Sequence, residues 1–137
     1  MFFSCGSASQ KEDCSLYRKG SFNSHIRSEH TDYFFKFVRD DSIQMETEEK
    51  TGDKATFRIV WTSPCEYELF LLTTTRKVPD SIIQRAKSHP LKTTIVSGTN
   101  DYYLFESTSE GSTHILKDTI WLDRRLPEKM PADHYSH

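Results

Sequence analysis

Residues 54–72 read KATFRIVWTSPCEYELFLL, and they hold the densest alternation of apolar and polar side chains in the chain. Phe57, Ile59 and Trp61 fall on one face of an extended strand, because successive side chains of a strand point to opposite faces. After a turn at the Thr-Ser-Pro sequence, the period of two resumes with Cys65, Tyr67, Leu69 and Leu71. The stretch therefore predicts a β-hairpin with an apolar inner face, which neighbouring strands must cover.

Short segments with the same period lie on both sides of this hairpin, separated by turn residues such as Gly, Asp and Ser. We expect further strands at 20–27, 32–40, 42–48, 91–97, 102–106 and 113–122. In the third of these segments, Ile43 and Met45 are expected to point inward and Gln44 and Glu46 outward, because apolar side chains favour the core.

One short helix is predicted near residues 80–88, where Ser81 and Gln84 fit a capping box. A helix of about two turns is not stable alone, since most helical stability in proteins comes from tertiary packing. We therefore expect it to dock on the sheet through Ile82 and Ile83.

The chain of 137 residues is long enough for one domain with a real core. About eight strands joined by short turns, with the helix between the fifth and sixth, predict a mainly β fold. Its strands would form an antiparallel meander that is a closed or strongly curved barrel. Residues 14–125 would form this single barrel domain, residues 1–13 a flexible tether and residues 126–137 a disordered tail. The protein is expected to be a monomer.

Composition argues against two classes of partner. A formal net charge of -2 and a pI near 6.3 give no electrostatic reason to expect a nucleic acid or an anionic membrane surface. The aromatic residues, 12% of the chain, supply large apolar areas for the core of the barrel.

The three cysteines are Cys5, Cys14 and Cys65, and an odd number in an exported protein suggests one disulfide plus one cysteine with another fate. Cys5 follows Met-Phe-Phe-Ser and precedes a polar run, which resembles the end of a bacterial lipoprotein signal. This resemblance implies a lipid anchor on Cys5 that attaches the protein to a membrane; the alternative is an incidental thiol. In an oxidising compartment Cys14 and Cys65 would pair, and otherwise they would be two buried free thiols.

Four short motifs carry a likeness to a known family: Gly20-Ser21-Phe22 after Cys14, RDDSIQME at 39–46, Trp61 with Cys65-Glu66-Tyr67, and TIWL at 119–122. Over residues 14–122 the chain resembles a family of small Gram-negative envelope lipoproteins of unknown function. The resemblance implies a lipid-anchored, periplasm-facing protein of the bacterial envelope; a cytoplasmic location is the alternative. Some members carry the label DNA topoisomerase IV, but this chain lacks the size and the basic groove of such an enzyme.

A second likeness is to lipocalin-like barrels, in which an aromatic residue near the first strand stacks under an arginine from the last strand. Here Phe22 stands where a tryptophan is usual, and Arg124 and Arg125 follow Trp121 near the last predicted strand. This likeness implies a barrel architecture rather than a particular ligand.

Four residues are candidates for ligand binding: Arg39, Gln44, Arg58 and Tyr67. If the barrel is wide enough to enclose a small apolar ligand, polar groups that flank an aromatic interior would orient it. The alternative is that these residues face solvent or cap the core, because eight-stranded barrels are often filled by side chains.

No catalytic residue, metal or cofactor is predicted. The chain contains neither a Gly-x-Ser-x-Gly elbow nor a Gly-rich phosphate loop. His25, Glu29 and His30 lie close in sequence, but on a strand the two histidines point to opposite faces. The sequence therefore favours a non-catalytic, lipid-anchored envelope protein that acts as a binding module. The alternative is a carrier of a small apolar ligand inside a lipocalin-like barrel.

Overall fold

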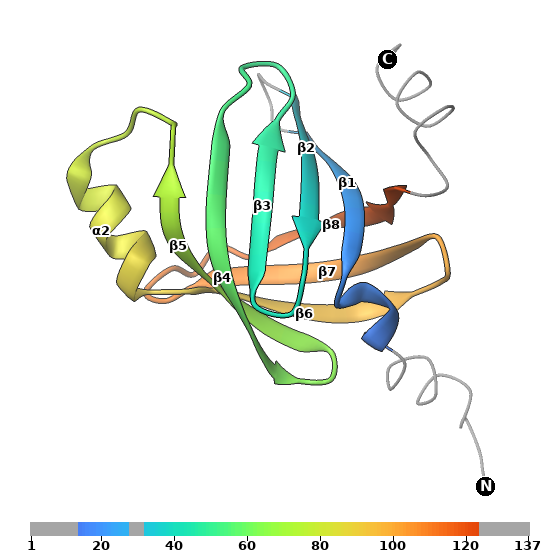
Figure 1. Ribbon diagram of the computed structural model, residues 1–137. Coiled ribbons are helices and arrows are strands. Elements are labelled where there is room, and N and C mark those ends of the chain that lie inside the picture. Colours follow the sequence, from blue (N-terminus) through green and yellow to red (C-terminus); the bar gives the residue numbers. More distant parts are fainter. Residues whose placement is uncertain (1–13, 28–31, 124–137) are drawn as a thin grey trace, which may run out of the picture.

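Eight antiparallel strands close into a barrel in the computed structural model, which describes residues 14–27 and 32–123 (Figure 1). Each strand pairs with the next one in the chain, and β8 pairs with β1 through Phe22–Leu122, Asn23–Trp121 and Ser24–Ile120. The strands are β1 Gly20–Arg27, β2 Asp32–Arg39, β3 Ile43–Glu48, β4 Lys54–Ser63, β5 Glu66–Thr74, β6 Leu91–Gly98, β7 Tyr102–Ser109 and β8 Leu116–Leu122. This confirms the predicted mainly β barrel.

Two helices lie at opposite ends of the barrel. The 3-10 helix η1, Cys14–Tyr17, precedes the start of β1, whereas the α-helix α2, Asp80–Ser88, follows the end of β5 (Figure 1). Because β1 and β5 run in the same direction around an up-and-down barrel, the start of one and the end of the other lie at different ends. We call the end beside η1 the closed end and the end beside α2 the open end.

The helix α2 begins differently from the prediction. Pro79 is its N-cap residue, no side chain caps it, and the backbone N–H of Ile82 donates to the carbonyl of Pro79 over 3.0 Å. The predicted capping box of Ser81 and Gln84 is therefore wrong, because Ser81 lies inside the first turn and not before it. Among the described residues, no helix has the length and the apolar character needed to cross a membrane.

The hairpin of β4 and β5 supplies its predicted face to the core. Ile59 pairs with Leu69 and Trp61 with Tyr67, and residues that pair across a ladder point to the same side of the sheet. Ile59, Tyr67 and Leu69 are buried, and Trp61 is partly buried against them. The alternation in residues 54–72 thus gave the correct inner face.

Strand β3 presents the opposite face to the one predicted. Gln44 is 2% exposed, whereas Met45 is 52% exposed on the outside. The ladders explain this reversal, because Gln44 pairs with the core residue Phe57 and Glu46 pairs with the core residue Phe37. A polar stripe of β3 therefore lines the interior of an otherwise aromatic barrel.

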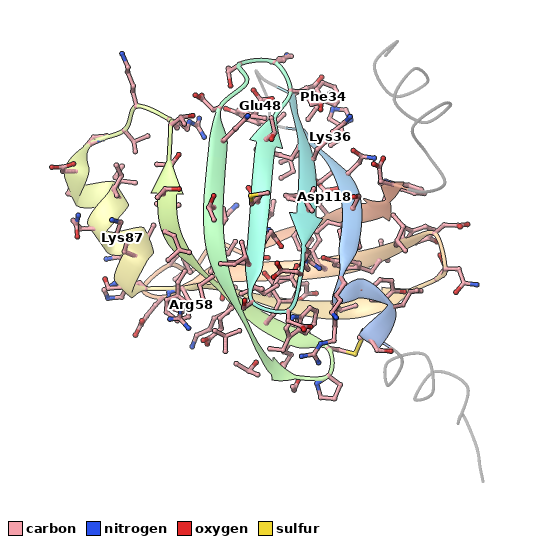
Figure 2. All side chains as sticks on the ribbon, viewed as in Figure 1. Phe34, Lys36, Glu48, Arg58, Lys87 and Asp118 are labelled. Atoms are coloured by element: carbon pink, nitrogen blue, oxygen red, sulfur yellow. A yellow bond between two sulfur atoms is a disulfide. The ribbon has the colours of Figure 1, made fainter. Side chains whose placement is uncertain are left out.

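A disulfide between Cys14 and Cys65 joins η1 to the turn between β4 and β5, as predicted (Figure 2). Cys14 is buried in the core at the closed end, and the bond spans 51 positions of the sequence. Cys5, with its predicted lipid anchor, lies outside the described residues, as do the predicted tether and tail.

We predict that reduction of this disulfide lowers the free energy of unfolding by about 4 kcal/mol, because the bond removes loop-closure entropy from the unfolded chain. Urea unfolding of the oxidised protein and of the variant C14A/C65A measures the difference. The variant C5A, which leaves both partners in place, is the control and should unfold like the parent protein. Equal midpoints for oxidised protein and double variant would contradict the prediction.

Candidate functional site

The closed end of the barrel is organised around the guanidinium group of Arg39, which is 2% exposed. Its Nε donates to Oε1 of Gln44 over 2.8 Å, and its Nη1 donates to the backbone carbonyl of Tyr17 over 2.7 Å. Its Nη2 donates to the hydroxyls of Tyr103 at 3.1 Å and Tyr67 at 3.3 Å. All three nitrogens therefore have partners inside the protein.

Aromatic rings surround this buried cation. The guanidinium carbon lies 4.8 Å from the ring centroid of Phe22, 4.8 Å from that of Tyr67 and 6.0 Å from that of Trp61. Cation–π contacts of this kind strengthen when water is excluded. The arginine that stacks on Phe22 thus comes from β2, and Arg124 and Arg125 lie outside the described residues. Burial raises the pKa of Tyr103, so its hydroxyl stays protonated.

Two adjoining cavities occupy the rest of the interior. The larger, about 330 Å³, lies at the open end, and the smaller, about 140 Å³, lies deeper in the barrel. Phe35 and Glu46 line both cavities, so the two are neighbouring compartments of one interior space. The apolar lining of the larger cavity comes mainly from Tyr33, Phe35, Phe57, Leu71, Val78 and Ile82.

Glu46 stands at the boundary between the two cavities. Its Oε2 accepts a hydrogen bond from Nε2 of Gln44 over 2.8 Å, and Gln44 in turn accepts from Arg39. Loss of solvation inside the barrel raises the pKa of Glu46 to about 7, against the opposing effects of Gln44 and the Arg39 charge. Near neutral pH the Glu46 carboxyl group is therefore present in both its protonated and its ionised forms.

Hydroxyl groups line the deeper cavity beside Glu46. Ser24, Thr93 and Ser107 are buried there, and the oxygens of Thr93 and Ser107 lie 2.7 Å apart. Hydroxyls both donate and accept hydrogen bonds, so this compartment can meet a polar group of either kind.

The second carboxylate of the polar stripe, Glu48, already accepts hydrogen bonds from backbone N–H groups. Its oxygens accept from the backbone N–H groups of Thr51 at 3.0 Å, Lys50 at 3.3 Å and Phe34 at 3.4 Å. Burial alone would raise the pKa of Glu48, but these hydrogen bonds lower it. Glu48 thus stabilises the turn after β3, where Figure 2 shows it at the rim of the open end.

The helix α2 covers part of the open end without burying a side chain. Ile82 and Ala86 line the larger cavity, and Ile82 is 54% exposed because it faces unfilled space. Nη2 of Arg85 donates to the carbonyl of Glu110 over 2.7 Å, which joins the helix to the segment between β7 and β8. The helix lies beside β5, where the prediction expects it to dock on the sheet. Of the two residues predicted to make this contact, Ile83 is partly buried, whereas Ile82 lines the cavity and stays largely exposed.

Of the four predicted binding residues, the structure brings together three: Arg39, Gln44 and Tyr67. Arg58 lies on the outer face of the barrel, where its guanidinium carbon is 4.4 Å from the ring centroid of Phe70 (Figure 2). The prediction that Glu46 points outward is wrong, because Glu46 lines both interior cavities. Residues two apart in a strand share a face, so the candidate binding residue Gln44 indicates that Glu46 lies on the same face.

The described residues contain no group of three His, Cys, Asp or Glu side chains that could hold a metal ion. His25 stacks on Phe34 with ring centroids 4.1 Å apart, and its Nε2 lies 3.7 Å from Oδ1 of Asp32. Glu29 and His30 lie outside the part of the chain that the structure describes.

We predict that R39M lowers the free energy of unfolding by at least about 3 kcal/mol, because it leaves buried acceptors without a donor. The matched control is R58M, which removes an exposed cation–π contact and should cost less than about 1 kcal/mol. Urea unfolding of both variants gives the comparison, and similar losses for the two would show that Arg39 does not hold the closed end together.

No protein-family model, curated protein or solved structure matches this chain. The resemblance to envelope lipoproteins, and the weaker one to lipocalin-like barrels, therefore stay predictions from the sequence. The barrel itself is established by its own strand pairing.

Proposed function

We propose that this protein is a non-catalytic carrier that binds a small, largely apolar molecule in the open end of the barrel. The observation that carries the proposal is the cavity of about 330 Å³ beneath α2, which continues into the deeper cavity of about 140 Å³. Ligand sites are typically concave, mainly apolar and provided with a few polar groups that fix orientation. The space at the open end has all three properties.

The arrangement of charged groups supports binding better than catalysis. An active site needs titratable groups that converge on one reacting atom. Glu46 stands inside the cavity, whereas Asp53, Lys54 and Arg76 line its outer part and Glu48 is occupied by backbone N–H groups. Each Å² of apolar ligand surface removed from water contributes about 25 cal/mol, so the apolar lining supplies the driving force for binding.

For the location, we propose a lipid-anchored protein of the bacterial envelope that faces the periplasm. The disulfide between Cys14 and Cys65 supports an oxidising compartment, because such bonds are rare in the cytosol. The sequence around Cys5 supports the anchor through its resemblance to a lipoprotein signal. A barrel attached to a membrane by a polar tether would be well placed to take up or release an apolar molecule there.

We predict that the wild-type protein binds the uncharged apolar dye Nile red and that A55F abolishes this binding. Ala55 lines the larger cavity, so a phenyl ring at this position fills space that the dye needs. Dye fluorescence in a titration measures the affinity. T56F is the matched control, because Thr56 pairs with the exposed Met45 on the outer face of the same strand. Equal binding by A55F and the parent protein would refute the cavity as the site.

We also predict that Gram-negative cells expressing the full precursor attach a labelled fatty acid to Cys5. Incorporation is measured after growth with radioactive palmitate, followed by gel electrophoresis of the purified protein. C5A should carry no label, while C14A/C65A should retain it. A precursor that stays unlabelled would remove the lipid anchor from the proposal and leave the binding function as it stands.

A further inference from the structure

We propose that the ligand is an organic ammonium compound, whose charged head meets Glu46 between Phe35 and Phe57 and whose apolar body fills the cavity beneath α2. This inference rests on the proposed binding function and names the class of molecule bound. The observation behind it is the carboxylate of Glu46, which lies in an aromatic cavity and, within the described part of the chain, accepts a hydrogen bond at Oε2 alone.

Glu46 has spare capacity to accept hydrogen bonds. Among the described residues, one side chain, Gln44, donates to it, and that bond is made to Oε2. The hydrogen bonds of the Arg39 guanidinium go instead to Gln44, the Tyr17 carbonyl and two tyrosine hydroxyls. An ionised carboxylate is an acceptor only, so the ligand group that meets Oε1 must be a donor.

The polar stripe itself offers an internal comparison. Glu48 has the same side chain two residues further along β3, but three backbone N–H groups satisfy it. The fold therefore supplies hydrogen-bond donors to one of the two carboxylates of the stripe and leaves Glu46 open to the cavity. A buried charge of this kind is stable only when a partner compensates it.

The walls around Glu46 favour a cation over a neutral donor. Phe35 on β2 and Phe57 on β4 lie on either side of β3, and both line the larger cavity. Aromatic ring faces attract cations, and hydrogen bonds between ionised partners are roughly twice as strong as neutral ones. An ammonium group therefore gains from both the carboxylate and the rings, whereas a hydroxyl gains little from the rings.

The other charged groups near Glu46 leave this preference in place. The positive charge of Arg39 favours the ionised form of Glu46, and Glu48 adds a negative charge on the same strand. The outer part of the cavity is lined by charged groups of both signs, Asp53, Lys54 and Arg76. Lys54 belongs to β4, and the other two lie just before β4 and just after β5. On the elements opposite, β1, β6 and β7, the deeper cavity presents the hydroxyls Ser24, Thr93 and Ser107, which carry no charge.

Isothermal titration calorimetry of the full chain with octylamine, octanol and octanoic acid tests the inference, because these probes share one apolar body and differ in the head group. We expect octylamine to bind at least about tenfold more tightly than octanol or octanoic acid to the wild-type protein. E46Q, which keeps the shape of the side chain, should weaken octylamine binding by roughly tenfold to a hundredfold and leave octanol binding unchanged. The control E106Q removes an ion-paired carboxylate on the outer face and should change neither affinity.

A pH series on the wild-type protein gives a second readout that needs no variant to fold. The pKa of Glu46 is about 7, and an alkylammonium group stays protonated to about pH 10. Octylamine binding should therefore tighten by roughly tenfold between about pH 6 and about pH 8, as Glu46 ionises, and octanol binding should stay constant.

The outcomes separate the ligand class from the binding function. If octanol or octanoic acid binds as tightly as octylamine, or if E46Q keeps full affinity for octylamine, the ammonium assignment is wrong while the cavity remains a binding site. If octylamine fails to bind although Nile red does, the assignment is again wrong. If neither the three probes nor Nile red binds, the proposed function itself fails.

Discussion

The closed end of this barrel depends on one buried positive charge, the guanidinium group of Arg39. The guanidinium of Arg39 lies in the closed end among aromatic rings, and burial of an unpartnered cation would be prohibitive. Its hydrogen bonds bring together η1, β3, β5 and β7, through the Tyr17 carbonyl, Gln44, Tyr67 and Tyr103. One side chain from β2 thus connects four other elements, so the geometry of the closed end follows from satisfying it.

The sequence predicts the inner face of some strands correctly but not that of β3, whose inner face holds the hydrogen-bond partner of Arg39. Alternation of apolar and polar residues located the strands, and the inner face of β4 and β5 followed because one face was clearly apolar. In β3 both faces contain plausible core residues, and the preference for burying Ile43 and Met45 gave the wrong answer. The hairpin of β2 and β3 indicates the correct inner face of β3. Arg39 pairs with Gln44 across its turn, so the two residues share a face.

The candidate site was less predictable than the fold for a physical reason. Whether an eight-stranded barrel is filled or hollow depends on how side chains of strands distant in sequence interlock, and no local pattern reports this. Arg39, Gln44 and Tyr67 could be selected as polar residues beside aromatic ones, and Arg58 was selected by the same rule although it alternates with Phe57 and so faces outward. Glu46 acquires its importance from the empty space beside it, which only the assembled barrel shows.

The ladder that closes the barrel is short, with three residue pairs between β1 and β8, and such a ladder is a natural place for local opening. If β1 separates from β8, it stays attached to the rest of the barrel at two places. Cys14 binds the segment before it covalently to Cys65, and eight residue pairs keep it on β2. The strand can therefore swing away and return but cannot readily cross to a neighbouring molecule, so the disulfide hinders strand exchange and the dimers or fibres that follow from it.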